Sequence, residues 1–296
     1  MKDFIIITDS CSDLDTDYIS QKEIPFVSLT CRIEDLEYKD DFGQSLSYKS
    51  FYDYMRHGKV PKTSQPSVHD FHKVFEEYVS KGLDILYICV SSGLSGTYNC
   101  AYIAKKMIQD DYPDNEIYIF DALTASVGQG LMVIKAVEMK ENGYSMESIV
   151  DYLEMNVQRL NTFIIVNDLS HLRRGGRISA SAAVIGRVLN INPVLTLNHQ
   201  GKVINIMKIR GRKKAVAQLA DFIAERIEAP EEQTIAINHG DCMEEALELK
   251  RIIQEKVPVR DVYINFIGPV VGTYGGPGAM AVFFLGKERQ QHIYES

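Results

Sequence analysis

The strongest constraint on the fold is a repeated order along the chain: a short apolar run, a loop of small and hydroxyl-bearing residues, and a segment with helical periodicity. Phe4–Thr8 is one such run, and Asp9-Ser10 ends it. Leu83–Val90 is the clearest run, and it is followed by the loop Ser91–Thr97 and by Tyr98–Ile108, whose apolar residues recur at helical spacing. Continuous apolar runs of this length are typical of buried parallel strands. The order therefore predicts a parallel sheet wrapped by helices.

The pattern changes in the second half of the chain. Val194–Leu197 and Val203–Ile209 flank Asn198-His199-Gln200-Gly201, which is typical of a hairpin with a glycine-containing turn. We therefore predict an α/β fold with two α/β lobes. The N-terminal lobe, residues 1–160, has the parallel sheet, and the C-terminal lobe, residues 161–296, has a mixed sheet.

Local signals predict three further segments. Ser67 and Asp70 form a capping-box variant at the start of a helix, which Gly82 ends. The acidic stretch Glu34–Ser50 is interpreted as a surface excursion, and Gly268–Gly278 as a loop.

Composition narrows the class of partner and the compartment. The 296 residues carry a formal net charge of −8, with 45% hydrophobic and 24% charged residues. This composition is typical of a globular protein, and the negative charge disfavours nucleic acid and anionic membrane surfaces as partners. No apolar stretch approaches the length of a membrane span, so no membrane insertion is expected. The five cysteines are odd in number and lack a C-x-x-C spacing, which indicates reduced thiols in a cytoplasmic protein.

Small and hydroxyl-bearing loops gather at the expected carboxyl ends of the strands, the edge where ligands bind in open parallel sheets. Ser91–Thr97 adds free backbone N–H groups at a helix start, which favour an anion. The plainer interpretation is that such residues only cap helices and shape turns. The coincidence of several loops on one edge favours a site for an anionic head group. These loops are Asp9–Asp13, Ser91–Thr97, Asp121–Ser126 and Gly268–Gly278.

Enzyme signatures are weak in this chain. Gly93-Leu94-Ser95-Gly96-Thr97 has the setting of a hydrolase nucleophile elbow, although Thr97 replaces the last glycine, so an acyl-ester hydrolase with Ser95 as nucleophile is the alternative function. Gly276–Ala281 matches a dinucleotide-binding motif only as letters, because a strand follows it. His69 and His72 lie three residues apart without a third ligand, so neither a metal nor a cofactor is expected.

Five motifs, in order along the chain, resemble the DegV family of bacterial fatty-acid-binding proteins. They are Thr8-Asp9-Ser10, Thr63-Ser64-Gln65-Pro66-Ser67, Ser91-Ser92-Gly93-Leu94-Ser95-Gly96-Thr97-Tyr98, Gly175-Gly176-Arg177-Ile178, and Gly268-Pro269-Val270-Val271-Gly272-Thr273 with Gly276-Pro277-Gly278. The resemblance implies two α/β lobes that close on a long-chain fatty acid, with its carboxylate among hydroxyls at the lobe junction. It also implies that a separate fatty acid kinase receives the bound acid and makes acyl phosphate for phospholipid synthesis, so this chain is a carrier and not an enzyme.

Site residues carry over by motif. Thr63 and Ser92 are expected to hold the carboxylate, with Ser95 and Arg177 in the surrounding polar network. Tyr274 stands where the family usually has histidine, and it donates a hydrogen bond but cannot carry positive charge. This departure predicts weaker head-group binding or a different amphipathic acid as ligand.

The densest basic cluster lies between Lys208 and Lys214. Its plainer interpretation is a solvated strand end and helix start, and its functional interpretation is docking to an acidic partner protein. The resemblance implies contact with the kinase through an arginine after the hairpin, and Arg210 is the best match by position. Arg212 is two residues away and would lie on the same side of a strand.

Overall fold

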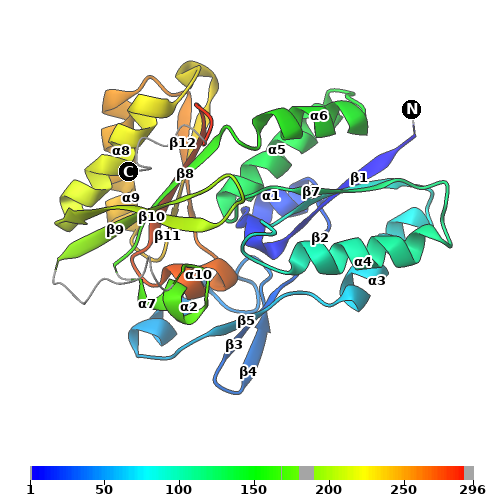
Figure 1. Cartoon of the computed structure of the whole chain (residues 1–296), viewed down its shortest axis with the longest axis horizontal. Helices are drawn as coiled ribbons and strands as arrows, with labels where there is room; N and C mark the ends of the chain where they lie inside the picture. Colours follow the sequence, from blue (N-terminus) through cyan, green and yellow to red (C-terminus); the bar gives the residue numbers. More distant parts are fainter. Residues whose placement is uncertain (1, 168, 180–189, 290–296) are drawn as a thin grey trace.

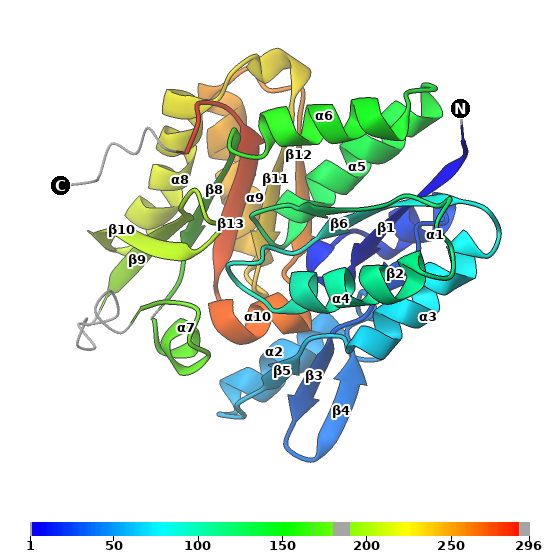
Figure 2. The same cartoon turned by 45° about the vertical axis from the view of Figure 1, so that its right-hand side comes forward.

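The computed structural model describes residues 2–167, 169–179 and 190–289. Its two main sheets lie in opposite halves of the molecule, and a smaller sheet lies beneath them (Figures 1 and 2). The predicted α/β architecture with a parallel N-terminal sheet and a mixed C-terminal sheet is confirmed. The division of the chain at residue 160 stays a prediction.

The N-terminal sheet is parallel and has the order β2-β1-β6-β7. Neighbouring residues of its strands point to opposite faces, so Ile6 packs toward one set of helices and Ile7 toward the other. Helices α1, α5 and α6 cover the first face, and α3 and α4 cover the second. The elements are β1 (Phe4–Asp9), β2 (Phe26–Val27), β6 (Asp84–Cys89), β7 (Ile117–Asp121), α1 (Thr16–Gln21), α3 (Val68–Val79), α4 (Thr97–Gln109), α5 (Val127–Glu141) and α6 (Met146–Asn156).

The predicted capping box is present at α3. The side chain of Ser67 accepts from the Asp70 backbone N–H, and the Asp70 carboxylate accepts from that of Ser67. The loops after β1, β6 and β7 lie at the carboxyl edge of the sheet, as expected. The loop after β1 includes a short 3-10 helix, η1 (Ser10–Ser12).

The C-terminal sheet is mixed and has the order β10-β9-β8-β13-β11-β12, in which only β11 and β12 pair in parallel. The predicted hairpin is confirmed as the antiparallel pair of β9 and β10. Helices α8 and α9 pack on one face of this sheet. The elements are β8 (Leu160–Ile165), α7 (Ser170–Arg174), β9 (Ile191–Leu197), β10 (Val203–Arg210), α8 (Arg212–Arg226), η2 (Pro230–Glu232), β11 (Thr234–His239), α9 (Met243–Lys256), β12 (Asp261–Phe266), α10 (Pro269–Gly275) and β13 (Met280–Leu285).

Two expectations about irregular segments were wrong. The stretch Glu34–Ser50 is not only a surface excursion, because it contains β4 and the start of α2, and Asp40 and Phe42 are buried. Gly268–Gly278 contains the helix α10, which Pro269 begins at a position where proline is tolerated. The small antiparallel sheet has the order β4-β3-β5. Its elements and the helix beside it are β3 (Thr30–Ile33), β4 (Leu36–Lys39), β5 (Lys62–Ser64) and α2 (Tyr48–Arg56).

A buried arginine ties the C-terminal segment to the junction between the lobes. The guanidinium of Arg289 donates to the backbone carbonyls of Leu123, Val157 and Leu160, at 2.7, 3.0 and 2.8 Å. Burial lowers the pKa of Arg289 to about 10. Within the described ranges, none of the helices combines the length and apolar character that a membrane span requires.

The contacts of Arg289 predict a stability effect. Each buried carbonyl that loses its donor costs about 1–3 kcal/mol, so Arg289→Met should lower the free energy of unfolding by at least about 3 kcal/mol. The exposed Arg260→Met is the matched control and should change it by less than about 0.5 kcal/mol. Urea denaturation of both variants measures the difference, and equal stability would contradict the structural role of Arg289.

Candidate functional site

A cavity of about 420 Å³ lies between the two lobes. The loops after β1, β6 and β7 form one wall through Cys11, Val90 and Ala125, among other residues. The opposite wall is the face of the C-terminal sheet that α8 and α9 do not cover. The carboxyl edge of the parallel sheet therefore borders the cavity, as the sequence predicted.

Strand periodicity explains why the opposite wall is apolar. On β8, Phe163 and Ile165 pack against the helices, whereas Thr162 and Ile164 line the cavity. The same alternation continues in the neighbouring strands, and Ala281 of β13 is small enough to leave volume. The apolar lining from this lobe includes Ile164, Val166, Leu172, Leu195, Leu197, Val203, Ile267, Ala279, Ala281 and Phe283.

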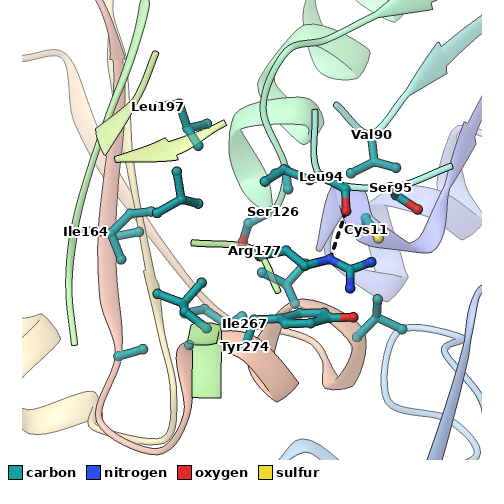
Figure 3. Close-up of a pocket in the computed structure, with 18 of the residues that line it drawn as sticks. Cys11, Val90, Leu94, Ser95, Ser126, Ile164, Arg177, Leu197, Ile267 and Tyr274 are labelled. Carbon is teal, nitrogen blue, oxygen red and sulfur yellow. Dashed lines mark hydrogen bonds between the residues drawn. The ribbon is translucent and has the colours of Figure 1, made fainter. Parts of the chain in front are cut away.

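Polar side chains gather at one end of the cavity, where β5, the loop after β6, the segment after α7 and the end of α10 meet. Thr63, Ser95, Arg177 and Tyr274 all line this end. Figure 3 shows the hydroxyls of Ser95 and Tyr274 and the guanidinium of Arg177 on the same side, away from Ile164 and Leu197. The hydroxyls of Thr63 and Tyr274 are 2.5 Å apart and share a hydrogen bond.

The guanidinium of Arg177 is held by backbone carbonyls and by an aromatic ring. Its Nε donates to the Leu94 carbonyl at 3.0 Å, and its Nη1 donates to the Gly175 carbonyl at 2.6 Å. It also lies 4.7 Å from the centre of the Tyr274 ring, a cation–π distance. Within the described part of the chain, Nη2 has no hydrogen-bond partner, so the N–H groups of this nitrogen are available to a ligand.

Gly175 is required for this arrangement. A Cβ at this position would lie 2.3 Å from the Tyr274 ring, closer than any real contact. The absence of a side chain at Gly175 therefore leaves room for the Tyr274 ring under Arg177.

A buried carboxylate supports the loops on the N-terminal side. Asp9 accepts from the backbone N–H groups of Cys11 and Val90, at 3.0 and 2.9 Å, and from the Tyr87 hydroxyl at 2.8 Å. Its burial raises the pKa of Asp9, and these hydrogen bonds oppose the rise. Because Cys11 and Val90 both line the cavity, Asp9 fixes the position of that wall.

The two serines of the Ser91–Thr97 loop that were expected at the carboxylate differ in position. Ser92 is exposed and does not line the cavity, and its backbone N–H donates to Asp121 at 3.1 Å. Ser95 lines the cavity, and its hydroxyl lies 2.8 Å from that of Thr97. The geometry therefore favours Ser95 over Ser92, because the turn after β6 directs Ser92 toward solvent.

Two contacts at this site were not anticipated from the sequence. Gln65 lines the polar end and donates to the Cys100 sulfur at 3.0 Å, and its place beside Thr63 in the Thr-Ser-Gln-Pro-Ser motif was the available signal. The Ser91 hydroxyl donates to the Gly201 carbonyl at 3.0 Å and joins the N-terminal loop to the C-terminal hairpin. Gly201 has φ +68, and a Cβ there would lie 2.1 Å from the Ser91 hydroxyl.

The hydrolase arrangement is incomplete among the described residues. The hydroxyl of Ser95 pairs with Thr97, and no histidine in this part of the chain hydrogen-bonds to it. Groups of three or more His, Cys, Asp or Glu side chains suited to a metal are also absent from the described ranges. His72 instead lies 3.7 Å from Glu76 on the same helix.

The basic cluster divides into bound and available side chains. Arg212 donates to the Glu245 carboxylate and to the Gly278 carbonyl, at 2.7 and 2.5 Å, so it serves a structural role. Arg210 is exposed at the end of β10, an edge strand, and has no polar partner among the described residues. Lys208 is exposed two residues earlier on the same strand, so both charges lie on one side of it.

Together, these features define a two-lobed α/β protein whose lobes enclose an apolar cavity with one polar end. The chain belongs to the DegV family, because the model described as "Uncharacterised protein, DegV family" matches residues 3–287. This confirms the resemblance drawn from the five motifs.

Relatives match over nearly the whole chain. A DegV domain-containing protein of Clostridium perfringens is 44% identical over 290 residues, which cover 98% of this chain and 100% of that protein. The crystal structure of a DegV family protein from Ruminococcus gnavus with vaccenic acid has a TM-score of 0.86 and 28% identity, and covers 95% of this chain and 99% of that one. The structure of DegV, a fatty acid binding protein from Bacillus subtilis, has a TM-score of 0.83 and 30% identity, and the match covers 97% of this chain and 100% of that one.

Proposed function

We propose that this protein is a fatty-acid carrier that encloses a long acyl chain between its lobes and presents the carboxylate to a separate fatty acid kinase. The observation that carries the proposal is the cavity itself, with its apolar walls and one polar end. The fatty-acid binding of the Bacillus subtilis protein and the vaccenic acid in the Ruminococcus gnavus structure support the same ligand class.

The walls supply the binding energy in this proposal. Each methylene that leaves water contributes about 0.8 kcal/mol, so an acyl chain gains affinity along its whole length. The volume lies in the ordinary range of ligand cavities, about 300–1,000 Å³. The residues that contact the chain are then the apolar side chains of β8, β9 and β13.

The polar end offers donors that suit a carboxylate. Thr63 and Tyr274 share one hydrogen bond between two hydroxyls, which leaves one proton to donate outward. Ser95 keeps its own proton for the ligand when Thr97 donates to it. Arg177 adds the positive charge through Nη2, which compensates for the neutral Tyr274 at the histidine position.

The hydroxyls also fit transfer to a kinase. The hydroxyls add neutral donors to the single charge of Arg177, so the carboxylate is held without a second cation and its oxygen stays nucleophilic toward a phosphoryl donor. The kinase makes acyl phosphate, and this chain performs no catalysis of its own. We place the exchange in the cytoplasm, where the five free cysteines stay reduced. The acyl-ester hydrolase alternative is disfavoured because Ser95 pairs with Thr97 and not with a base.

The proposal predicts different effects at two serines. A hydrogen bond to a charged group contributes about 1.5–3 kcal/mol, so Ser95→Ala should weaken palmitic acid binding by about tenfold or more. Ser92→Ala is the matched control, because Ser92 is exposed and outside the cavity, and its affinity should stay within about twofold of the unchanged protein. Isothermal titration of delipidated protein measures both, and a loss in Ser92→Ala alone would contradict the proposed site.

A second prediction concerns kinase docking. Arg210→Ala should reduce acyl-phosphate formation by the cognate kinase, because it removes an available charge from the edge of the sheet. Lys214→Ala, an exposed change in α8, is the control for loss of positive charge alone. Lipid occupancy measured by mass spectrometry should be unchanged in both variants. Normal turnover with Arg210→Ala would rule out this docking residue.

A further inference from the structure

Two carboxylates of the N-terminal lobe are buried where that lobe meets α10. Asp13 and Asp40 are only 1% and 2% exposed. The Asp13 carboxylate accepts from the backbone N–H of Gly268 at 3.0 Å and from the Ser126 hydroxyl at 2.5 Å. The Asp40 carboxylate accepts from the backbone N–H of Val270 at 3.2 Å. Both therefore bond to the start of the same helix.

The two carboxylates converge on one glycine. A Cβ at Gly268 would lie 2.5 Å from an oxygen of Asp13 and 3.5 Å from an oxygen of Asp40. Neither forms an ion pair within the described part of the chain, so two like charges would share one buried site. Close buried carboxylates favour a state that holds at least one proton.

A chain of hydrogen bonds from the C-terminal sheet ends at Asp13. Asn238 donates to Ser126 at 2.9 Å, and Ser126 donates to Asp13, but the buried Oδ1 of Asn238 receives no hydrogen bond from the described residues. Among the residues that the structure describes, the titratable groups that interact with the pair are carboxyls, thiols and phenols and none is basic: Asp9, Asp41, Cys11, Cys31, Tyr48, Tyr52 and Tyr263.

Helix α10 connects this pair to the cavity. Val270, near its start, and Tyr274, near its end, both line the cavity, and Tyr274 shares its hydrogen bond with Thr63. Separation of α10 from the N-terminal lobe would expose the carboxylates and open the polar end together. Figure 2 shows α10 between the two main sheets, above the small sheet.

We propose that Asp13 and Asp40 form a proton-dependent clasp that holds α10 against the N-terminal lobe, so that the bound acid is retained at low pH and released faster as the pH rises. The inference rests on the proposed function, since it describes how the same cavity opens. Asp13 and Asp40 act through α10 and are positioning residues, because they do not line the cavity themselves.

The direction follows from the burial of the pair. Burial raises the pKa of Asp40 to about 7 and that of Asp13 well above its ordinary value. Exposure to water on opening would return these values toward about 4. The closed state then binds more protons than the open state. The free energy that favours the closed state is therefore fully present below about pH 4 and is lost as the pH rises through about 7.

The test measures release of a fluorescent fatty acid. We would follow the dissociation of cis-parinaric acid from the full-length protein into phosphatidylcholine vesicles between about pH 5.5 and pH 8.5. One pKa unit corresponds to a tenfold change, so the rate should rise by at least about tenfold over this range. Asp40→Asn keeps an oxygen to accept from Val270 but loses one of the two titrating carboxyls, so its rate should rise clearly less over this range than that of the unchanged protein, with Asp13 responsible for the remaining rise.

The exposed Asp35→Asn, in the turn between β3 and β4, is the matched control and should follow the unchanged protein. The same slope in Asp40→Asn and in the unchanged protein would overturn the inference while leaving fatty-acid binding intact. If the probe does not bind or a variant does not fold, a carbon-13 NMR titration of the ligand-free, unsubstituted protein measures the aspartate pKa values directly. Two aspartate carboxyls that titrate at or above about pH 6 support the clasp, and titration of every aspartate below about pH 5 overturns it.

Discussion

The six-stranded sheet has one face that α8 and α9 do not cover, and the rest of the structure depends on how that face is covered. Helices α8 and α9 bury the opposite face, so Thr162, Ile164 and their neighbours in the adjacent strands must be shielded by another part of the chain. The start of α5 covers part of β11 and β13, and the loops at the carboxyl edge of the parallel sheet face the rest. An apolar cavity remains between the lobes, and the contacts around it include the hydrogen bonds between Ser91 and Gly201 and between Gly268 and Asp13.

The polar end of the cavity combines one positively charged side chain with several neutral hydroxyls. Arg177 is the single cationic side chain that lines it, among the residues that the structure describes, and backbone carbonyls already hold two of its nitrogens. The hydroxyls of Thr63, Ser95 and Tyr274 complete the site without further charge. Such an end orients an anionic head group, while the apolar walls provide most of the binding energy. The proposed function of carrier follows from this division of roles.

The sequence predicted the features that depend on local pattern. Apolar periodicity identified the parallel sheet and the hairpin, and the Thr-Ser-Gln-Pro-Ser and Gly-Gly-Arg motifs identified Thr63 and Arg177 as neighbours at one site. Pattern alone did not separate Ser92 from Ser95, because the turn after β6 decides which hydroxyl points inward. It also missed the burial of Asp40, since an acidic stretch is ordinarily exposed and only the contact with α10 covers it. The first of these features depends on the path of one turn, and the second depends on how the two lobes meet.

The central claim is that the cavity holds an acyl chain with its carboxylate at the end formed by Ser95, Arg177 and Tyr274. The most direct test is a crystal structure of the protein with a long-chain fatty acid brominated at its terminal carbon, with the bromine located by anomalous scattering. The account predicts a bromine peak inside the cavity among the apolar side chains around Ile164 and Leu197, and a carboxylate within hydrogen-bond distance of Ser95. A bromine peak beside Arg177, or outside the cavity, would contradict it.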